Sequence, residues 1–133
     1  MKAAYHIGRI IFGLWFLFSG AEYFFPSLGL QPLGNQPLSI EFSLTLIHSG
    51  LFAWIKAAEV LIGLACLADR GMPAAALACL PLTVVIGWWN FVLEGGLVPW
   101  IFGIATAVIN LIMLWPYRRL YLPFLVWNAP RDY

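Results

Sequence analysis

The sequence has few charged residues: Asp, Glu, Lys and Arg make up 10% of its 133 residues, whereas hydrophobic residues make up 62%. A soluble domain carries about 25% charged residues. This composition therefore excludes a soluble protein whose surface is covered with polar groups. The net charge is only +1, which excludes the strong basic field that is typical of nucleic-acid binding. The composition therefore indicates an integral membrane protein with a single domain over 1–133.

Cysteine is also scarce. The only two, Cys66 and Cys79, form no CxxC pair, and this spacing predicts neither a disulfide framework nor a zinc site. We interpret both as small apolar packing residues within helices and expect no working dithiol. A period-2 alternation of polar and apolar residues is absent as well, which argues against a membrane β-barrel.

Long apolar stretches are what the chain has in abundance. Each of four stretches is close to the ~20 residues that a helix needs to cross a bilayer, and they cover about 4–25, 44–68, 73–93 and 98–115. Helices are the reasonable spanning form because hydrocarbon offers no water to backbone groups. We therefore predict an all-α bundle of four transmembrane helices. The first stretch is longer than the ~7–15 apolar residues of a signal peptide, so we expect a retained helix.

Two segments lie outside these helices. The segment 26–43 contains three prolines and is predicted to be non-helical, yet it keeps many apolar side chains. It either lies along the outer membrane face as a cap over the bundle or is an ordinary external loop with apolar anchors. The tail 116–133 contains Tyr121 and Trp127, and such amphipathic rings favour the membrane interface. It is too short and broken by proline for a fifth span.

The positive charges predict the orientation of the bundle. They lie at the start of the first helix, between the second and third helices, and after the fourth, whereas the other two loops contain no Lys or Arg. Because cytoplasmic loops are enriched in Lys and Arg, we expect both termini to be cytoplasmic in a multi-pass protein of a bacterial cytoplasmic membrane. The residues used are Lys2, Arg9, Arg70, Arg118, Arg119 and Arg131.

The second helix contains the stretch AWIKAAEVLIG, residues 53–63, in which Lys56 and Glu59 interrupt an apolar run. A lone charge at the bilayer centre costs at least ~2.5–3.5 kcal/mol on insertion scales. Residues three apart share a helical face and can pair. Gly63 extends the same face and permits a neighbouring helix to approach closely. We therefore expect this face to point into the bundle.

Several polar residues should gather in the outer half of the bundle, beneath the 26–43 segment. An apolar cavity with a few polar groups suits a small hydrophobic ligand such as a quinone headgroup or a lipid, and His48 or Glu59 could pass protons there. Alternatively, the Lys56–Glu59 pair only fixes helix packing. In that case the neighbouring Trp88 and Trp89 belong to an interfacial belt, and His48 is simply hydrated. The candidate ligand-binding residues are Lys56, Glu59, Asn90, Trp88, Trp89, Glu22 and His48.

Two stretches, RIIFGLWFLFSGAEYFFP (9–26) and GLFAWIKAAEVLIGLACLADRGMPAAALACLPLTVV (50–85), resemble the DoxX-like membrane proteins. The shared features are an Arg followed by Gly in the first helix, a Glu followed four residues later by Gly in the second (Glu59 and Gly63), and a third helix marked by proline. The first helix of the family often carries a Lys after its second Gly, whereas this chain has Ala21-Glu22.

The resemblance implies a four-helix membrane bundle, in a family whose members often have no defined activity and some of which look like accessory partners of membrane redox enzymes. The name-giving relative is similar to a subunit of a thiosulfate:quinone oxidoreductase. We expect either such an accessory subunit, which binds a quinone or lipid as homo-oligomer or with a redox partner, or a non-catalytic scaffold whose buried polar residues fix packing and oligomerisation. We expect no catalysis by this chain alone, because neither a nucleophile–base constellation nor a metal-ligand set is visible in the sequence.

Overall fold

The computed structural model describes residues 2–29 and 33–128, and every regular element within them is helical. The helices are α1 (Lys2–Phe24), α2 (Pro37–His48), α3 (Leu51–Ala68), α4 (Met72–Trp88), α5 (Leu97–Leu114) and the short α6 (Arg118–Tyr121). A π-helical segment, η2 (Trp89–Glu94), continues α4 without a break. The 3-10 turns are η1 (Pro26–Leu28), η3 (Trp115–Tyr117) and η4 (Leu122–Leu125).

Four helical segments are long and apolar enough to cross a membrane: Lys2–Phe24, Leu51–Ala68, Met72–Glu94 and Leu97–Leu125. Large apolar side chains are exposed on their outer faces, such as Leu61 and Val84 at 68% and 69%. Lysine, glutamate, asparagine and threonine side chains are buried between the helices instead. An apolar exterior around a polar interior is the arrangement that a hydrocarbon solvent favours, and the chain is a multi-pass membrane protein.

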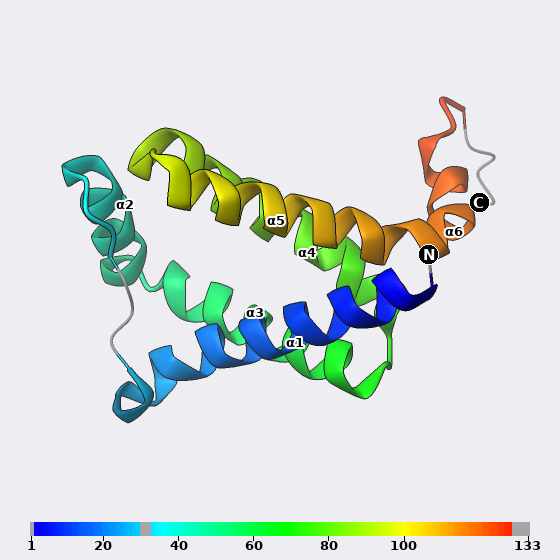
Figure 1. Ribbon diagram of the computed structural model, residues 1–133, viewed down its shortest axis with the longest axis horizontal. Helices are drawn as coiled ribbons and strands as arrows, with labels where there is room; N and C mark the ends of the chain where they lie inside the picture. Colours follow the sequence, from blue (N-terminus) through cyan, green and yellow to red (C-terminus); the bar gives the residue numbers. More distant parts are fainter. Residues whose placement is uncertain (1, 30–32, 129–133) are drawn as a thin grey trace.

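The long helices run side by side, with α1 against α3, α4 against α5, and a further contact between α1 and α5 (Figure 1). Helix α2 stands crosswise at one end of the bundle, which we call the α2 end. The beginning of α1 and helix α6 lie at the opposite end, the α6 end (Figure 1). Both described extremities of the chain therefore lie at the same end of the bundle.

Glycines bring α1 and α3 into close contact. A Cβ added at Gly63 of α3 would lie 2.6 Å from the Leu17 backbone nitrogen and 2.9 Å from the Gly13 carbonyl oxygen. A Cβ added at Gly20 of α1 would lie 2.7 Å from the Lys56 carbonyl oxygen. Because small residues let helix backbones approach closely within a membrane, these glycines determine the separation of α1 from α3.

The first span, the third span and α5 have bounds within two residues of the predicted 4–25, 73–93 and 98–115, although helical turns continue the last span to Leu125, within the predicted tail. The second span differs. The predicted helix 44–68 is divided at Ser49 and Gly50, where Gly50 has a φ of +78°. The interpretation of 26–43 as non-helical is wrong for 37–43, which belong to α2, and the loop is correspondingly shorter. Of that segment, residues 30–32 lie outside the described residues, as do Arg131 and the last part of the tail.

Local sequence explains why α2 begins where it does. Pro37 stands at the first helical position, where its missing N–H costs nothing and its fixed φ favours a helix. Gln36 and Ser39 form a reciprocal capping box, in which the Ser39 hydroxyl accepts a hydrogen bond from the Gln36 backbone N–H at 3.2 Å. The proline that the sequence pattern treats as an interruption therefore starts a helix.

Helices α4 and α5 are joined by a buried amide. The Thr83 hydroxyl lies 3.1 Å from Asn110 Oδ1, and Asn110 Nδ2 donates to the Ala76 carbonyl at 3.0 Å. Cys66 and Cys79 are free thiols in the apolar core nearby and have no exposed surface. Their burial agrees with a packing role.

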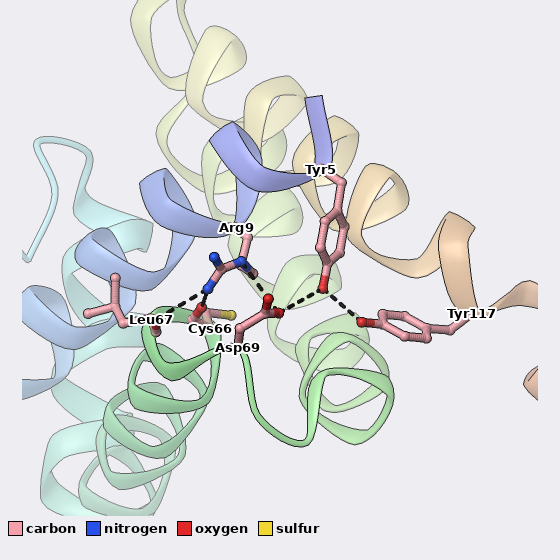
Figure 2. A network of polar contacts seen from close by, with 6 residues as sticks. All are labelled: Tyr5, Arg9, Cys66, Leu67, Asp69 and Tyr117. Atoms are coloured by element: carbon pink, nitrogen blue, oxygen red, sulfur yellow. Dashed lines mark hydrogen bonds and ion pairs between the residues drawn. The ribbon is translucent and has the colours of Figure 1, made fainter. Parts of the chain in front are cut away.

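A polar network closes the α6 end (Figure 2). Arg9 of α1 donates through Nη1 to the backbone carbonyls of Cys66 and Leu67, the latter at 3.2 Å, and its Nε lies 3.6 Å from Asp69 Oδ1. The Tyr5 hydroxyl donates to the same carboxylate oxygen at 3.3 Å and lies 2.8 Å from the Tyr117 hydroxyl. Since the last carbonyls of a helix have no partner within the helix, Arg9 caps the C-terminus of α3.

Candidate ligand pocket at the α2 end

A cavity of about 200 Å³ lies at the α2 end, between α1, α2, α3, α4 and η2. Its walls are mostly apolar and aromatic, with polar side chains at a few positions. The residues that line it are Trp15, Phe16, Ser19, Phe42, Ser43, Leu46, Phe52, Ile55, Lys56, Glu59, Val85, Ile86, Trp89 and Asn90. Because three of the spans and α2 all contribute to this wall, the cavity exists only in the folded bundle.

The charged part of the wall is the Lys56–Glu59 pair on α3. Lys56 Nζ lies 2.9 Å from Glu59 Oε2 and donates to Ser19 Oγ of α1 at 2.8 Å. The same ammonium lies 5.0 Å from the centre of the Phe52 ring, within the range of a cation–π contact. The two residues are only 4% and 5% exposed, so both charges are held away from solvent and bounded by the cavity.

Hydrogen-bonding capacity remains on this wall. Only Oε2 of Glu59 has a protein partner among the described residues, which leaves Oε1 as an acceptor. Ser19 accepts from Lys56 and keeps its own proton to donate. The cavity can therefore present both an acceptor and a donor to a bound polar group.

Asn90 also lines the cavity and belongs to the π-helical segment η2. Its Nδ2 donates to the Ile86 carbonyl at 2.8 Å, whereas its Oδ1 has no hydrogen bond to the described residues. π-Helical turns inside longer helices occur frequently at functional sites, because the widened turn changes the direction of side chains. The sequence predicts a regular helix over 73–93. The spacing of its apolar residues does not indicate the π-helical segment η2.

Glu94, at the end of η2, attaches the segment before α2 to the bundle. Its carboxylate accepts hydrogen bonds from the Asn35 backbone N–H at 2.8 Å and from Asn35 Nδ2 at 2.7 Å. Further donors are the Ser39 hydroxyl at 2.6 Å and the Gln36 backbone N–H at 3.4 Å. Hydrogen bonds to an ionised acceptor are the stronger ones, so Glu94 positions α2, which contributes Phe42, Ser43 and Leu46 to the cavity wall.

The structure brings together four of the seven candidate residues proposed from the sequence: Lys56, Glu59, Asn90 and Trp89 all line the cavity. The other three lie elsewhere. Trp88 is 58% exposed on the outer surface, and His48 is exposed at the end of α2. Glu22 is partly buried beside the η1 turn and does not line the cavity.

Sequence reasoning did not identify Ser19, Ser43 and the α2 side chains as part of the site. Ser19 is 37 residues from Lys56 in the chain, and nothing in its neighbourhood distinguishes it from other small residues of a packed helix. Ser43 and Phe42 were placed in a non-helical loop. Recognition of Pro37 as a helix start would have put Ser39 and Ser43 on one helical face, four residues apart.

Comparison of this chain with family models, with curated proteins and with solved structures finds no match.

Proposed function

We propose that this protein binds the headgroup of a quinone, or of a similarly small hydrophobic molecule, in the α2-end cavity and serves as an accessory subunit of a membrane redox system. The observation that carries the proposal is the position of the Lys56–Glu59 pair. A pair that only fixed helix packing would be sealed between the helices, whereas this pair lines a cavity with aromatic walls.

The volume limits the ligand. An apolar cavity of ~150 Å³ binds benzene, whereas pockets that enclose a drug-sized ligand measure ~300–1,000 Å³. The volume of about 200 Å³ therefore suits one substituted ring. A longer apolar tail would extend past Val85, whose side chain is 42% exposed at the cavity rim.

The polar groups suit a ring that carries oxygen atoms. A quinone carbonyl can accept from the Ser19 hydroxyl or the Lys56 ammonium, and a quinol hydroxyl can donate to Glu59 Oε1 or Asn90 Oδ1. Both redox forms of such a ring could therefore be accommodated. The proposed accessory role follows from the resemblance to DoxX-like proteins, and membership of that family is part of the proposal.

The charge distribution supports a membrane orientation with the α6 end in the cytoplasm. Five of the seven Lys and Arg residues are at this end, and Glu22, Glu41 and Glu94 are at the other. Positive charge is enriched on the cytoplasmic side of membrane proteins. A cysteine introduced at exposed Arg70 should therefore react with a membrane-impermeant thiol reagent only after the cells are opened, and one at His48 beforehand.

Ligand binding can be tested without breaking the ion pair. Val85→Trp should fill the cavity rim, whereas Val84→Trp places the same side chain on the neighbouring outer surface, where Val84 is 69% exposed. We expect a short-chain ubiquinone to bind the purified wild-type protein and the Val84→Trp variant, and to bind Val85→Trp at least about tenfold more weakly. Equal binding by both variants, or none by the wild type, would refute a ligand site here.

The second candidate is a non-catalytic scaffold in the membrane. It is favoured by the hydrogen bond from Lys56 to Ser19, which links α3 to α1 beside their glycine contact. Under this alternative, variants of Lys56 and Glu59 change thermal stability or oligomeric state, while both valine variants behave alike and no quinone is retained. Native mass spectrometry of the gently solubilised protein reports bound molecules and stoichiometry together and so distinguishes the two functions.

A further inference from the structure

A second cavity, of about 350 Å³, lies at the α6 end, remote from the quinone site proposed above. It is formed where the first two turns of α1 meet the junction of α5 and α6. Its lining residues are Lys2, Tyr5, His6, Trp115, Pro116 and Arg118. Half of them carry a cationic group or an imidazole, and none carries a carboxylate.

The surroundings of this cavity are positive. Lys2 and His6 are four residues apart and share a face of α1, and Arg118 begins α6 on the other side of the cavity. Asp69 is the acidic residue nearest to it among the described residues. Its carboxylate is directed to the Tyr5 hydroxyl and to Arg9, and so is already partnered by a cation (Figure 2).

Arg118 is held in place at the cavity wall. Its guanidinium lies 4.7 Å from the centre of the Trp115 ring, and its Nη1 donates to the Trp115 carbonyl at 3.0 Å. A guanidinium has five N–H donors in a fixed fork, so four remain after this hydrogen bond. Such a fork suits the bidentate recognition of a phosphate group.

An apolar stripe leads from the cavity along α5 toward the middle of the span. Ile104, Val108, Leu111 and Trp115 are spaced i, i+4, i+7 and i+11, which places them on one helical face. All four side chains are exposed. A ligand that has an anionic head in the cavity could therefore lay an apolar chain along this face.

We propose that the α6-end cavity binds the headgroup of an anionic phospholipid of the phosphatidylglycerol or cardiolipin type. The phosphodiester pairs with Arg118, Lys2 and His6, and an acyl chain follows the stripe from Trp115 to Ile104. Basic pockets between transmembrane helices are the recurring sites for such headgroups. The stripe favours a lipid over a free phosphate ion, which has no apolar part to bury.

The proposal can be tested by titrating the purified full chain in a neutral detergent with phosphatidylglycerol, with phosphatidylcholine and with inorganic phosphate, with native mass spectrometry as the readout. The test variant is Lys2→Gln/His6→Gln/Arg118→Gln. A single variant, Arg118→Gln, has a matched control in Arg70→Gln, which removes one exposed cation from the same end but outside the cavity. Circular dichroism and elution volume verify that each variant is folded.

We expect phosphatidylglycerol to bind the wild-type protein at least about tenfold more tightly than phosphatidylcholine, and the triple variant to lose this preference while Arg70→Gln keeps it. Arg118→Gln alone should lose part of it. Equal losses in Arg118→Gln and in Arg70→Gln, which each remove one charge, would overturn the proposal, because the preference would then reflect overall charge. Displacement of phosphatidylglycerol by millimolar inorganic phosphate would also overturn it, since the site would then take a free anion.

Discussion

Lys56 and Glu59 form a salt bridge of 2.9 Å inside the bundle, and the same ammonium donates to Ser19 of a different helix at 2.8 Å. One lysine therefore neutralises a carboxylate on its own helix and links that helix to α1. Neither charge could be left alone without cost in a low-dielectric interior. This relationship leads to the first of four predictions.

Removal of one member of the pair should destabilise the protein more than removal of both. Lys56→Met leaves the Glu59 carboxylate buried without its partner, and breaking a buried pair in this way costs about 3–5 kcal/mol. In Lys56→Met/Glu59→Gln both charges are gone, and the loss should be smaller than that of Lys56→Met alone. Unfolding in mixed micelles of increasing sodium dodecyl sulfate content measures the free energies. A double variant whose loss equals the sum of the losses of Lys56→Met and of Glu59→Gln, each measured alone, would show that the charges are not coupled.

Gly63→Ala should destabilise the contact between α1 and α3. The added methyl group would lie 2.6 Å from the Leu17 backbone nitrogen, and backbone atoms cannot move aside as the end of a flexible side chain can. We expect a loss of about 1–3 kcal/mol, the usual cost of overpacking, in the same unfolding assay.

Gly87→Ala is the matched control for this substitution. A Cβ at Gly87 would meet its nearest neighbours, atoms of the Phe91 ring, at 3.9 Å, an ordinary contact distance. Alanine also has a higher helix propensity than glycine. Stability should therefore be unchanged or increased, and a loss as large as that of Gly63→Ala would contradict the role assigned to close helix approach.

Glu94→Gln should loosen α2 without unfolding the bundle. Glutamine has nearly the same shape, but its neutral amide presents its own donors where Ser39 and the Asn35 backbone now donate to a carboxylate. Hydrogen–deuterium exchange should become at least about tenfold faster at the amides of 35–48, which corresponds to the loss of one hydrogen bond to a charged group. Amides in the middle of α5 should keep their exchange rates.

Glu41→Gln serves as the control for that experiment, since Glu41 is exposed on α2 itself. It removes a carboxylate from the same helix without touching the hydrogen bonds to Glu94. Exchange over 35–48 should remain at the wild-type rate. If the two variants accelerate exchange equally, the Glu94 carboxylate does not position α2.

Arg9→Gln should weaken the α6 end. It removes the donor to two backbone carbonyls at the end of α3 and leaves Asp69 without its cation. Unsatisfied buried groups cost about 1–3 kcal/mol each, although part of this cost is recovered here because Asp69 is partly exposed. We expect a loss of about 1–2 kcal/mol in the unfolding assay. Arg70→Gln, which removes an exposed cation in the adjacent turn, should change stability by less than about 0.5 kcal/mol.

The membrane class, the all-helical fold, the four spans and the inward direction of Lys56 and Glu59 could all be predicted from the sequence. Each depends on a local pattern: apolar runs of bilayer length, or two charges three residues apart on a face that also contains Gly63. Because exposing a charge to hydrocarbon is costly, the face that contains Lys56 and Glu59 must point into the bundle. The membrane orientation and the family resemblance remain predictions.

Only the tertiary structure decided what surrounds that face. The contacts of Lys56 with Ser19, and of Glu94 with Asn35 and Ser39, join residues 37 to 59 positions apart, and no local periodicity contains such pairings. The π-helical turn that holds Asn90, and the conversion of a proline-rich segment into helix α2, depend in the same way on packing against distant elements. A hydropathy pattern specifies which residues avoid lipid. The α2-end cavity, in contrast, is defined by two features of the tertiary structure. These are the close approach of α1 and α3 at the glycine contacts and the position in which the Glu94 carboxylate holds α2.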